Sequence, residues 1–206
     1  MVMINKILLL VKEKLENVLQ SSYPRSDQWV VLGNPPRPDD PDLSGRSNGL
    51  TMSLVSLQSD VSTSSFVPPS FGRDDRYYTT TAPLYIDAHV MFAGTFDNQH
   101  YESGLAQLSR TISFFQETPT LTRENSPNLP PEMDKLHIEM VSLDLAQASH
   151  LLTMTGARYC PFVLYRMRRL PFAAQAITSV APAIRSADRP DALPAGAASA
   201  TRAAAA

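Results

Sequence analysis

The chain has 206 residues and a mass of 22.6 kDa, enough for one domain around a single hydrophobic core but too short for two full domains. A formal net charge of -2 and a pI near 6.1 exclude a chain drawn by its overall charge to nucleic acid or to an anionic membrane. The single cysteine, Cys160, excludes an intrachain disulfide, and no apolar run approaches the roughly 20 residues of a membrane-spanning helix. With charged residues directly after the first apolar run and no cleavage-type site, the sequence predicts a soluble, cytoplasmic protein.

The first half of the chain contains one helical and two strand-like segments. Residues Met3 to Gln20 repeat apolar side chains at steps of three and four, which predicts an amphipathic helix closed by Pro24. The run "WVVLG" predicts a short buried strand. The next strand, "LTMSLVSL", changes the phase of its alternation at Val55, which indicates a bulge or a bend. The polar stretches "NPPRPDDPDLSGRSNG" and 59–81 are predicted to be exposed loops.

The clearest strand is "PLYIDAHVMFAGTF", which we expect to be central in a sheet because its apolar and polar residues alternate. Its core-facing set is predicted to be Leu84, Ile86, Ala88, Val90 and Phe92. Asp97 is the expected N-cap of a helix that ends at Pro119. The stripe that this helix is expected to bury consists of Tyr101, Leu105, Leu108, Ile112 and Phe115.

The second half begins with the extended segment "TLTRE" and the proline-rich "NSPNLPPEM", which fits neither helix nor interior strand. A strand over "KLHIEMVSL" precedes a helix that Ser142 or Asp144 caps and that ends at Gly156, and a last strand follows from Pro161 to Leu170. The order of these elements predicts an α+β domain whose mixed sheet is packed by helices. Because alanine dominates after Pro171, we divide the chain into a domain at 1–170 and a flexible Ala/Pro-rich tail at 171–206.

No catalytic, cofactor-binding or metal-binding residue is predicted. The sequence lacks G-x-S-x-G, G-x-x-x-x-G-K-[ST], G-x-G-x-x-G and H-E-x-x-H, and its four histidines have no second histidine or cysteine at ligand spacing. Cys160 is expected to be a buried packing residue. A small hydrolase that uses Cys160 with a distant histidine and aspartate is the alternative.

Four arginines form the one concentrated basic feature: Arg158, Arg166, Arg168 and Arg169. Strand alternation places Arg166 and Arg168 on a common face. A solvated face and a contact surface for an acidic partner subunit explain the cluster equally well. Because no aromatic platform accompanies the charge, nucleic acid is a weaker interpretation, and we expect no nucleic-acid partner and no direct membrane insertion.

Several fragments, taken in order, are together more specific than any one alone. They are "MINKILLLVKEKLENVL", "VVLGNP", "SLVSL", "PLYIDAHVMFAGTF", "YESGLAQLSRTISFFQ", "NSPNLP", "KLHIEMVSLDLAQASHLL" and "GARYCPFVLYRMRRL". This series resembles the cap or tail-terminator proteins of contractile, phage-tail-like injection systems, over about residues 1–170. The chain departs from the family near Leu152, where tryptophan is usual, near Cys160, where leucine is usual, and in its longer early loops.

The resemblance implies a tail-terminator-like fold and a structural role without cofactors. The expected protein forms a six-fold ring with itself on the inner-tube and sheath subunits, ends their growth, fixes the particle length and is assembled in the cytoplasm. The prolines of "TLTRENSPNLP" are expected to keep it from folding back, which leaves backbone groups for strand addition or loop contact with a neighbour. The predicted contact residues are Thr120, Leu121, Thr122, Arg123, Arg158, Arg166, Arg168 and Arg169. An adaptor that ties the particle to a membrane or to cargo through the tail is a further alternative.

Overall fold

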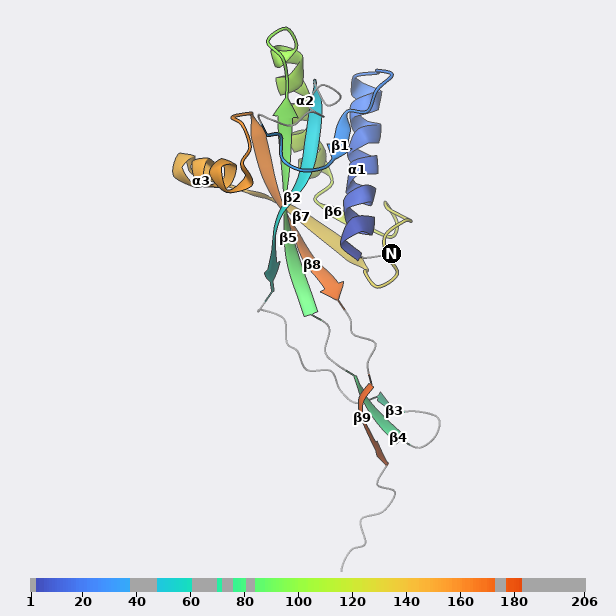
Figure 1. The fold of residues 1–206 in the computed structure, drawn as a ribbon. Helices are drawn as coiled ribbons and strands as arrows, with labels where there is room; N and C mark the ends of the chain where they lie inside the picture. Colours follow the sequence, from blue (N-terminus) through green and yellow to red (C-terminus); the bar gives the residue numbers. More distant parts are fainter. Residues whose placement is uncertain are drawn as a thin grey trace, which may run out of the picture.

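The computed structural model describes residues 3–37, 48–60 and 84–172, together with the backbone of 70–71, 76–80 and 177–182. Its elements are α1 Met3–Ser22, β1 Val30–Leu32, β2 Gly49–Ser59, β3 Ser70–Phe71, β4 Arg76–Thr80, β5 Leu84–Thr95, α2 Tyr101–Glu117, β6 Thr120–Thr122, β7 Lys135–Val141, α3 Leu145–Thr155, β8 Phe162–Phe172 and β9 Ile177–Pro182. The main sheet has the order β1-β2-β5-β8-β7-β6, with β1 parallel to β2 and the other neighbours antiparallel (Figure 1). The mixed, helix-packed α+β fold that the sequence predicts is confirmed.

One face of this sheet carries the large hydrophobic core. The apolar stripe of α1, including Ile7, Leu15 and Leu19, is fully buried there, beside α2. The ring of Phe115 in α2 lies 5.4 Å from that of Phe92 and 4.5 Å from that of Tyr165, measured between centroids. The prediction that α2 packs on the sheet through Phe115 is therefore confirmed.

Helix α2 differs from the prediction at its first turns. Its N-cap is His100, whereas Asp97 lies before the helix and accepts the backbone N–H of His100 at 2.8 Å. Tyr101 and Leu105 are exposed, so the N-terminal part of the predicted stripe is wrong. The observed buried face consists of Gly104, Gln107, Leu108, Thr111, Phe114 and Phe115. The helix turns this way because the ring of Phe96 lies directly against Gly104.

The strands follow the predicted alternation with two register shifts, one in β2 against β5 and one in β5 against β8, between Ile86 and Ala88. The register of β2 against β5 shifts between Leu54 and Ser56, which confirms the predicted bulge. β5 lies between β2 and β8, as expected of a central strand, and Ala88, Val90 and Phe92 belong to the large core. Leu84 is an exception, because it is exposed at the start of the strand.

Helix α3 lies on the other side of the sheet from α1 (Figure 1). Asp144 is its N-cap and forms a capping box with Gln147, so Asp144 and not Ser142 caps the helix. Gly156 ends it with a φ of 67°, as the sequence predicts. A small apolar cluster of Met91, Ala93, Cys160 and Leu164 lies on this face of the sheet.

A second sheet of three antiparallel strands has the order β3-β4-β9, beyond the end of the main sheet where β5 begins (Figure 1). Strands β3 and β4 lie within the stretch 59–81, so the expectation of a loop is wrong at 70–71 and 76–80, and β9 lies within the expected tail. The division of the chain at residue 171 stays a prediction. Most of the first predicted loop and residues 183–206 lie outside the described residues.

Candidate interaction site

The predicted contact segment begins with β6, the edge strand next to β7. Pro119 accepts the backbone N–H of Ile138 at 2.8 Å, so the backbone groups of Thr120 and Thr122 face away from β7. The side chain of Asn125 turns back over them: its Nδ2 donates to the Thr120 carbonyl at 3.0 Å and its Oδ1 accepts the Thr122 N–H at 2.9 Å. Ser126 N–H donates to the Thr122 carbonyl at 2.8 Å. The backbone groups of this segment that were expected to be free for strand addition are therefore hydrogen-bonded within its own turn.

The proline-rich stretch after β6 folds back, contrary to the expectation. Arg123 Nη2 donates to the Pro131 carbonyl at 2.6 Å and to the Met133 carbonyl at 3.2 Å, which ties the two ends of the stretch together. Leu121 and Met133 are buried in the large core. Of the four predicted contact residues here, Thr120 and Thr122 are half-buried and Arg123 is exposed. That these residues contact a neighbouring subunit through their side chains stays a prediction.

Part of the opposite edge of the main sheet, at the start of β1, is also covered by a side chain. Glu16 of α1 accepts the backbone N–H of Trp29 at 2.9 Å with Oε1 and that of Val30 at 2.7 Å with Oε2. The helix thereby holds a carboxylate against the outer side of β1. At β6 and at the start of β1, a side chain therefore occupies a position that a further strand would need, although β1 itself pairs with β2 only at Leu50, Thr51 and Met52.

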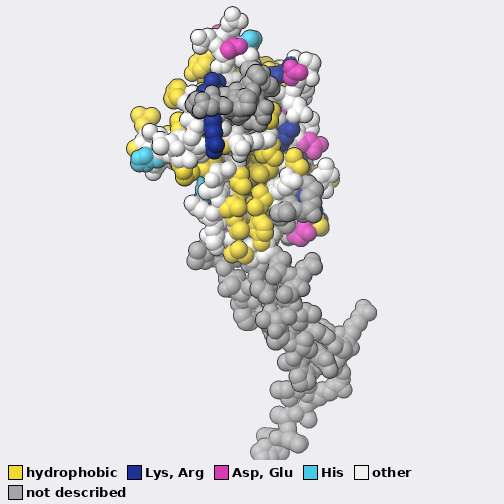
Figure 2. All heavy atoms as spheres, in the orientation of Figure 1, with side chains coloured by type: hydrophobic (Ala, Val, Ile, Leu, Met, Phe, Trp, Pro, Cys, Tyr) yellow, Lys and Arg dark blue, Asp and Glu magenta, His cyan; other side chains and the backbone are white. Residues whose placement is uncertain are grey.

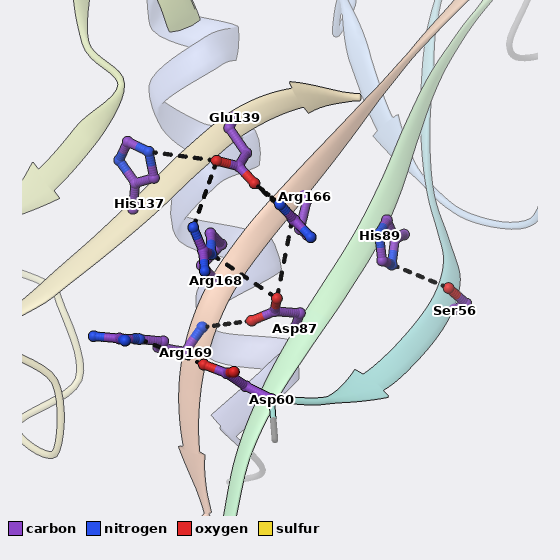
Figure 3. A network of polar contacts seen from close by, with 9 residues as sticks. All are labelled: Ser56, Asp60, Asp87, His89, His137, Glu139, Arg166, Arg168 and Arg169. Carbon is purple, nitrogen blue, oxygen red and sulfur yellow. Dashed lines mark hydrogen bonds and ion pairs between the residues drawn. The ribbon is translucent and has the colours of Figure 1, made fainter. Parts of the chain in front are cut away.

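The predicted arginine cluster divides into two parts. Arg166 and Arg168 share the face of the sheet opposite the large core, which confirms their predicted common face (Figure 3). Arg166 Nε donates to Glu139 Oε1 at 2.6 Å and lies 4.0 Å from Asp87 Oδ2. Arg168 lies 3.8 Å from Glu139 Oε2 and 4.0 Å from Asp87 Oδ2. Two cations and two carboxylates balance here, so this part is a poor surface for an acidic partner.

Arg169 and Arg158 lie apart from that pair. Arg169 has a φ of 59°, and its backbone N–H donates to Asp87 Oδ1 at 2.9 Å while its side chain lies 3.4 Å from Asp60 (Figure 3). Arg158 is exposed before β8, where its backbone N–H donates to the Pro36 carbonyl at 2.9 Å. Sequence reasoning missed the carboxylates Asp87 and Glu139, which pair with Arg166 and Arg168, although both occupy polar positions of alternating strands.

The histidines near this network are hydrogen-bonded or paired. His89 Nδ1 lies 3.2 Å from Ser56 Oγ (Figure 3), and burial, with the charge of Arg166, lowers the pKa of His89. The imidazole is therefore neutral at pH 7. His137 Nε2 lies 3.8 Å from Glu139 Oε2. The described residues hold no group of three or more His, Cys, Asp or Glu side chains that could bind a metal ion.

A groove lies between α3 and the strands β7 and β8, with a cavity volume of about 860 Å³. One wall is the stripe Leu145, Ala148 and Leu152 of α3, and the other includes Cys160 and Leu164. Sequence reasoning assigned no role to this surface. The signal was there, because α3 carries more apolar residues than one buried helix face requires.

The groove does not fit the cysteine hydrolase. Burial raises the pKa of the Cys160 thiol, which keeps it protonated at neutral pH. None of the described residues that line the groove is a histidine or an acid that could act as its base. Among the described residues, no helix is both long and apolar enough to cross a membrane.

Comparisons with known proteins define first a class and then a family. The PVC sheath/tube terminator of an extracellular contractile injection system, in its extended state, superposes with a TM-score of 0.60 at 12% sequence identity, over 92% of this chain and 64% of that chain. The anti-feeding prophage cap, an AFP tube terminating cap, superposes with a TM-score of 0.53 at 12% identity, over 86% of this chain and 58% of that chain. The fold is thus that of terminator and cap structures.

The model of the Pvc16 N-terminal domain matches residues 10–186, and no curated protein matches the chain. The chain belongs to the Pvc16 N-terminal domain family. The resemblance seen in the sequence is confirmed, and the match extends past residue 170, where the resemblance was expected to end. The chain spans less than two thirds of the length of the two solved structures that it resembles.

Proposed function

We propose that the chain is a structural cap subunit of a contractile injection system. It forms a six-fold ring with copies of itself on the last inner-tube and sheath subunits, ends their growth and so fixes the particle length. One observation carries the proposal: the Pvc16 N-terminal domain family accounts for residues 10–186, and the fold is shared with a sheath/tube terminator and a tube terminating cap. Assembly takes place in the cytoplasm before the particle is released.

The geometry of the described residues supports a binding role over a catalytic one. The polar network around Asp87 pairs its charges within the chain, and the Cys160 thiol is buried and protonated. What the surface offers to other proteins is a set of exposed side chains, including Arg123 and Arg158, and the apolar groove under α3. Surfaces of these kinds suit contacts between subunits.

Deleting the gene and imaging the particles by electron microscopy tests the proposal. We expect tubes and sheaths of widely varying length without the gene, and uniform length when the wild-type gene is returned. Particles of normal, uniform length in the deletion strain would overturn the proposal. Negative-stain images of the protein on purified tube ends measure the ring and its symmetry directly.

A further inference from the structure

The three adjacent strands β2, β5 and β8 all connect the main sheet to the second sheet. Along the chain, β2 precedes β3, β4 precedes β5 and β8 precedes β9. Ser59 pairs with Ile86 and Ile86 with Leu170, so the end of β2, the start of β5 and the end of β8 lie side by side. The second sheet lies beyond this end of the main sheet (Figure 1). Its position therefore depends on how these three strand ends are held.

The end of β8 contains a bulge that its sequence requires. Met167 and Leu170 are both buried in the large core, although strict alternation would place residues three apart on opposite faces of a strand. The register of β8 against β5 shifts between these two residues, and Arg168 and Arg169 together lie opposite Asp87. Such an extra residue bends the strand and returns Leu170 to the core.

Arg169 occupies the strained position of this bulge. Its φ of 59° lies in the left-handed region, which is uncommon for residues other than glycine. Asp87 Oδ1 accepts the backbone N–H of Arg169 at 2.9 Å, and Asp87 is only 8% exposed. Asp87 Oδ2 lies 4.0 Å from the Nε atoms of both Arg166 and Arg168, which compensates the buried carboxylate. A side chain of β5 thus fixes the bulge of β8.

The side chain of Arg169 reaches across β5 to the end of β2. Its Nε lies 3.4 Å from Asp60 Oδ2 (Figure 3), although β8 and β2 are not neighbours in the sheet. Asp60 directly follows β2, and its backbone N–H donates to the Tyr85 carbonyl of β5 at 2.9 Å. The side chain of Asp60 is only 7% exposed, so a cation nearby offsets part of the cost of burying its charge. One arginine therefore contacts both β5 and the end of β2.

Apolar packing holds the three strand ends only weakly. Leu57 of β2 exposes 44% and Leu84 of β5 exposes 50% of its surface. Figure 2 shows hydrophobic side chains gathered in a band on the surface toward this end of the described part. Because the stabilisation from apolar side chains grows with the area that they bury, these residues contribute less here than in the large core. The polar contacts on the other face of the sheet are the stronger restraint on the strand ends.

We propose that Asp60, Asp87 and Arg169 form a clasp that holds the ends of β2, β5 and β8 together and so fixes the direction of the second sheet. The bulge bends β8, and the contacts of Arg169 hold this bend against both β5 and β2. The clasp acts within one chain, so the inference does not depend on the proposed function. Without the clasp the large core keeps its apolar packing, whereas the three strand ends lose their fixed arrangement.

The variant Arg169→Gly tests the clasp, because glycine adopts a positive φ without steric cost and so keeps the bulge while the side-chain contact is lost. Spin labels are placed on the full chain in a Cys160→Ala background, at Asn17→Cys in α1 and Ser179→Cys in β9. Pulsed dipolar spectroscopy then measures the distribution of distances between the two labels. We expect a narrow distribution in the parent and a broader one in Arg169→Gly. The matched control, Arg158→Gly, changes an exposed arginine before β8 and should match the parent.

Hydrogen exchange gives a second, local measurement. In Arg169→Gly the amide of Asp60 should exchange faster than in the parent. The amide of Leu50, which donates to the Trp29 carbonyl at the other end of β2, should keep its rate. Asp60→Asn removes the charge with little change of shape, and it should shift both measurements in the same direction as Arg169→Gly.

The inference is overturned if Arg169→Gly gives a distribution as narrow as that of the parent, or if Arg158→Gly broadens it equally. A broad distribution in the parent itself would contradict a fixed direction of the second sheet. Faster exchange at Leu50 as well as at Asp60 would mean that Arg169 supports the whole of β2, and this result would also overturn the clasp. The particle-length assay is independent of these measurements, so the proposed function stands or fails separately.

Discussion

Two glycines make room for one aromatic ring at the junction of β5 and α2. A Cβ placed on Gly104 would lie 2.3 Å from Phe96 Cγ, and a Cβ on Gly94 would lie 2.3 Å from Phe96 Cε2. Helix propensity alone predicts that Gly104→Ala stabilises the protein by about 1 kcal/mol. The clash reverses the sign, and we expect a loss of roughly 1–3 kcal/mol in the free energy of unfolding, measured by urea denaturation. Ser113→Ala, exposed on the same helix, is the control and should be neutral or slightly stabilising.

A buried phenol gives the core a defined response to alkaline pH. Burial raises the pKa of Tyr165 to about 12, so between pH 10 and 12 the unfolded chain ionises this group before the folded chain does. The contribution of this group to the free energy of unfolding is fully present below pH 10 and is lost as pH rises. At pH 11 the loss is roughly 1.4 kcal/mol. We expect the free energy of unfolding of Tyr165→Phe to fall less between pH 8 and pH 11 than that of the wild type. Tyr159→Phe, at an exposed site, should match the wild-type loss.

At the scale of elements, the turn after β6 determines whether that edge of the sheet is open. Replacing Asn125 with alanine leaves the Thr120 carbonyl and the Thr122 N–H without the side chain that they contact. We expect a loss of about 1–2 kcal/mol in the free energy of unfolding, together with self-association that grows with protein concentration in light scattering. Asn128→Ala changes an exposed asparagine in the same turn region and should leave both measurements within error. Equal behaviour of the two variants would contradict the closing role of Asn125.

An element could be predicted from the sequence where its buried face consists of apolar residues, and not where small or polar residues form much of that face. The stripe of α1 and the phase change near Val55 are visible in the sequence, and both appear in the structure. The buried face of α2 is not, because Gly104, Gln107 and Thr111 form much of it and its rotation is set by Phe96. The short strands β3, β4 and β9 pair with one another, and segments of 2, 5 and 6 residues are too short for their periodicity to predict partners so distant in sequence.

At the scale of the whole molecule, the contact role of the predicted site residues stays a prediction, whereas the open backbone expected after β6 is not observed. Prolines after β6 indicated an open segment, but the side chain of Asn125 closes it, and such a contact leaves no periodic signal. The arginines of β8 were located correctly by strand parity, whereas their pairing with Asp87 and Glu139 depends on the register of three strands. The groove under α3 follows from the way the helix stands off the sheet, which no local pattern specifies.

Removing the residues after Phe172 should affect the two sheets differently. β9 pairs with β4 and lies outside the six-stranded sheet, so its loss should leave the large core unchanged. We expect the thermal midpoint to stay within about 3 °C of the wild type, the size of a 1 kcal/mol effect in a chain of this length. Hydrogen exchange should accelerate at the amides of β4 that face β9 and not in β5 or β8. If the midpoint falls much further, the residues after Phe172 support the core, and the division of the chain near residue 171 is wrong.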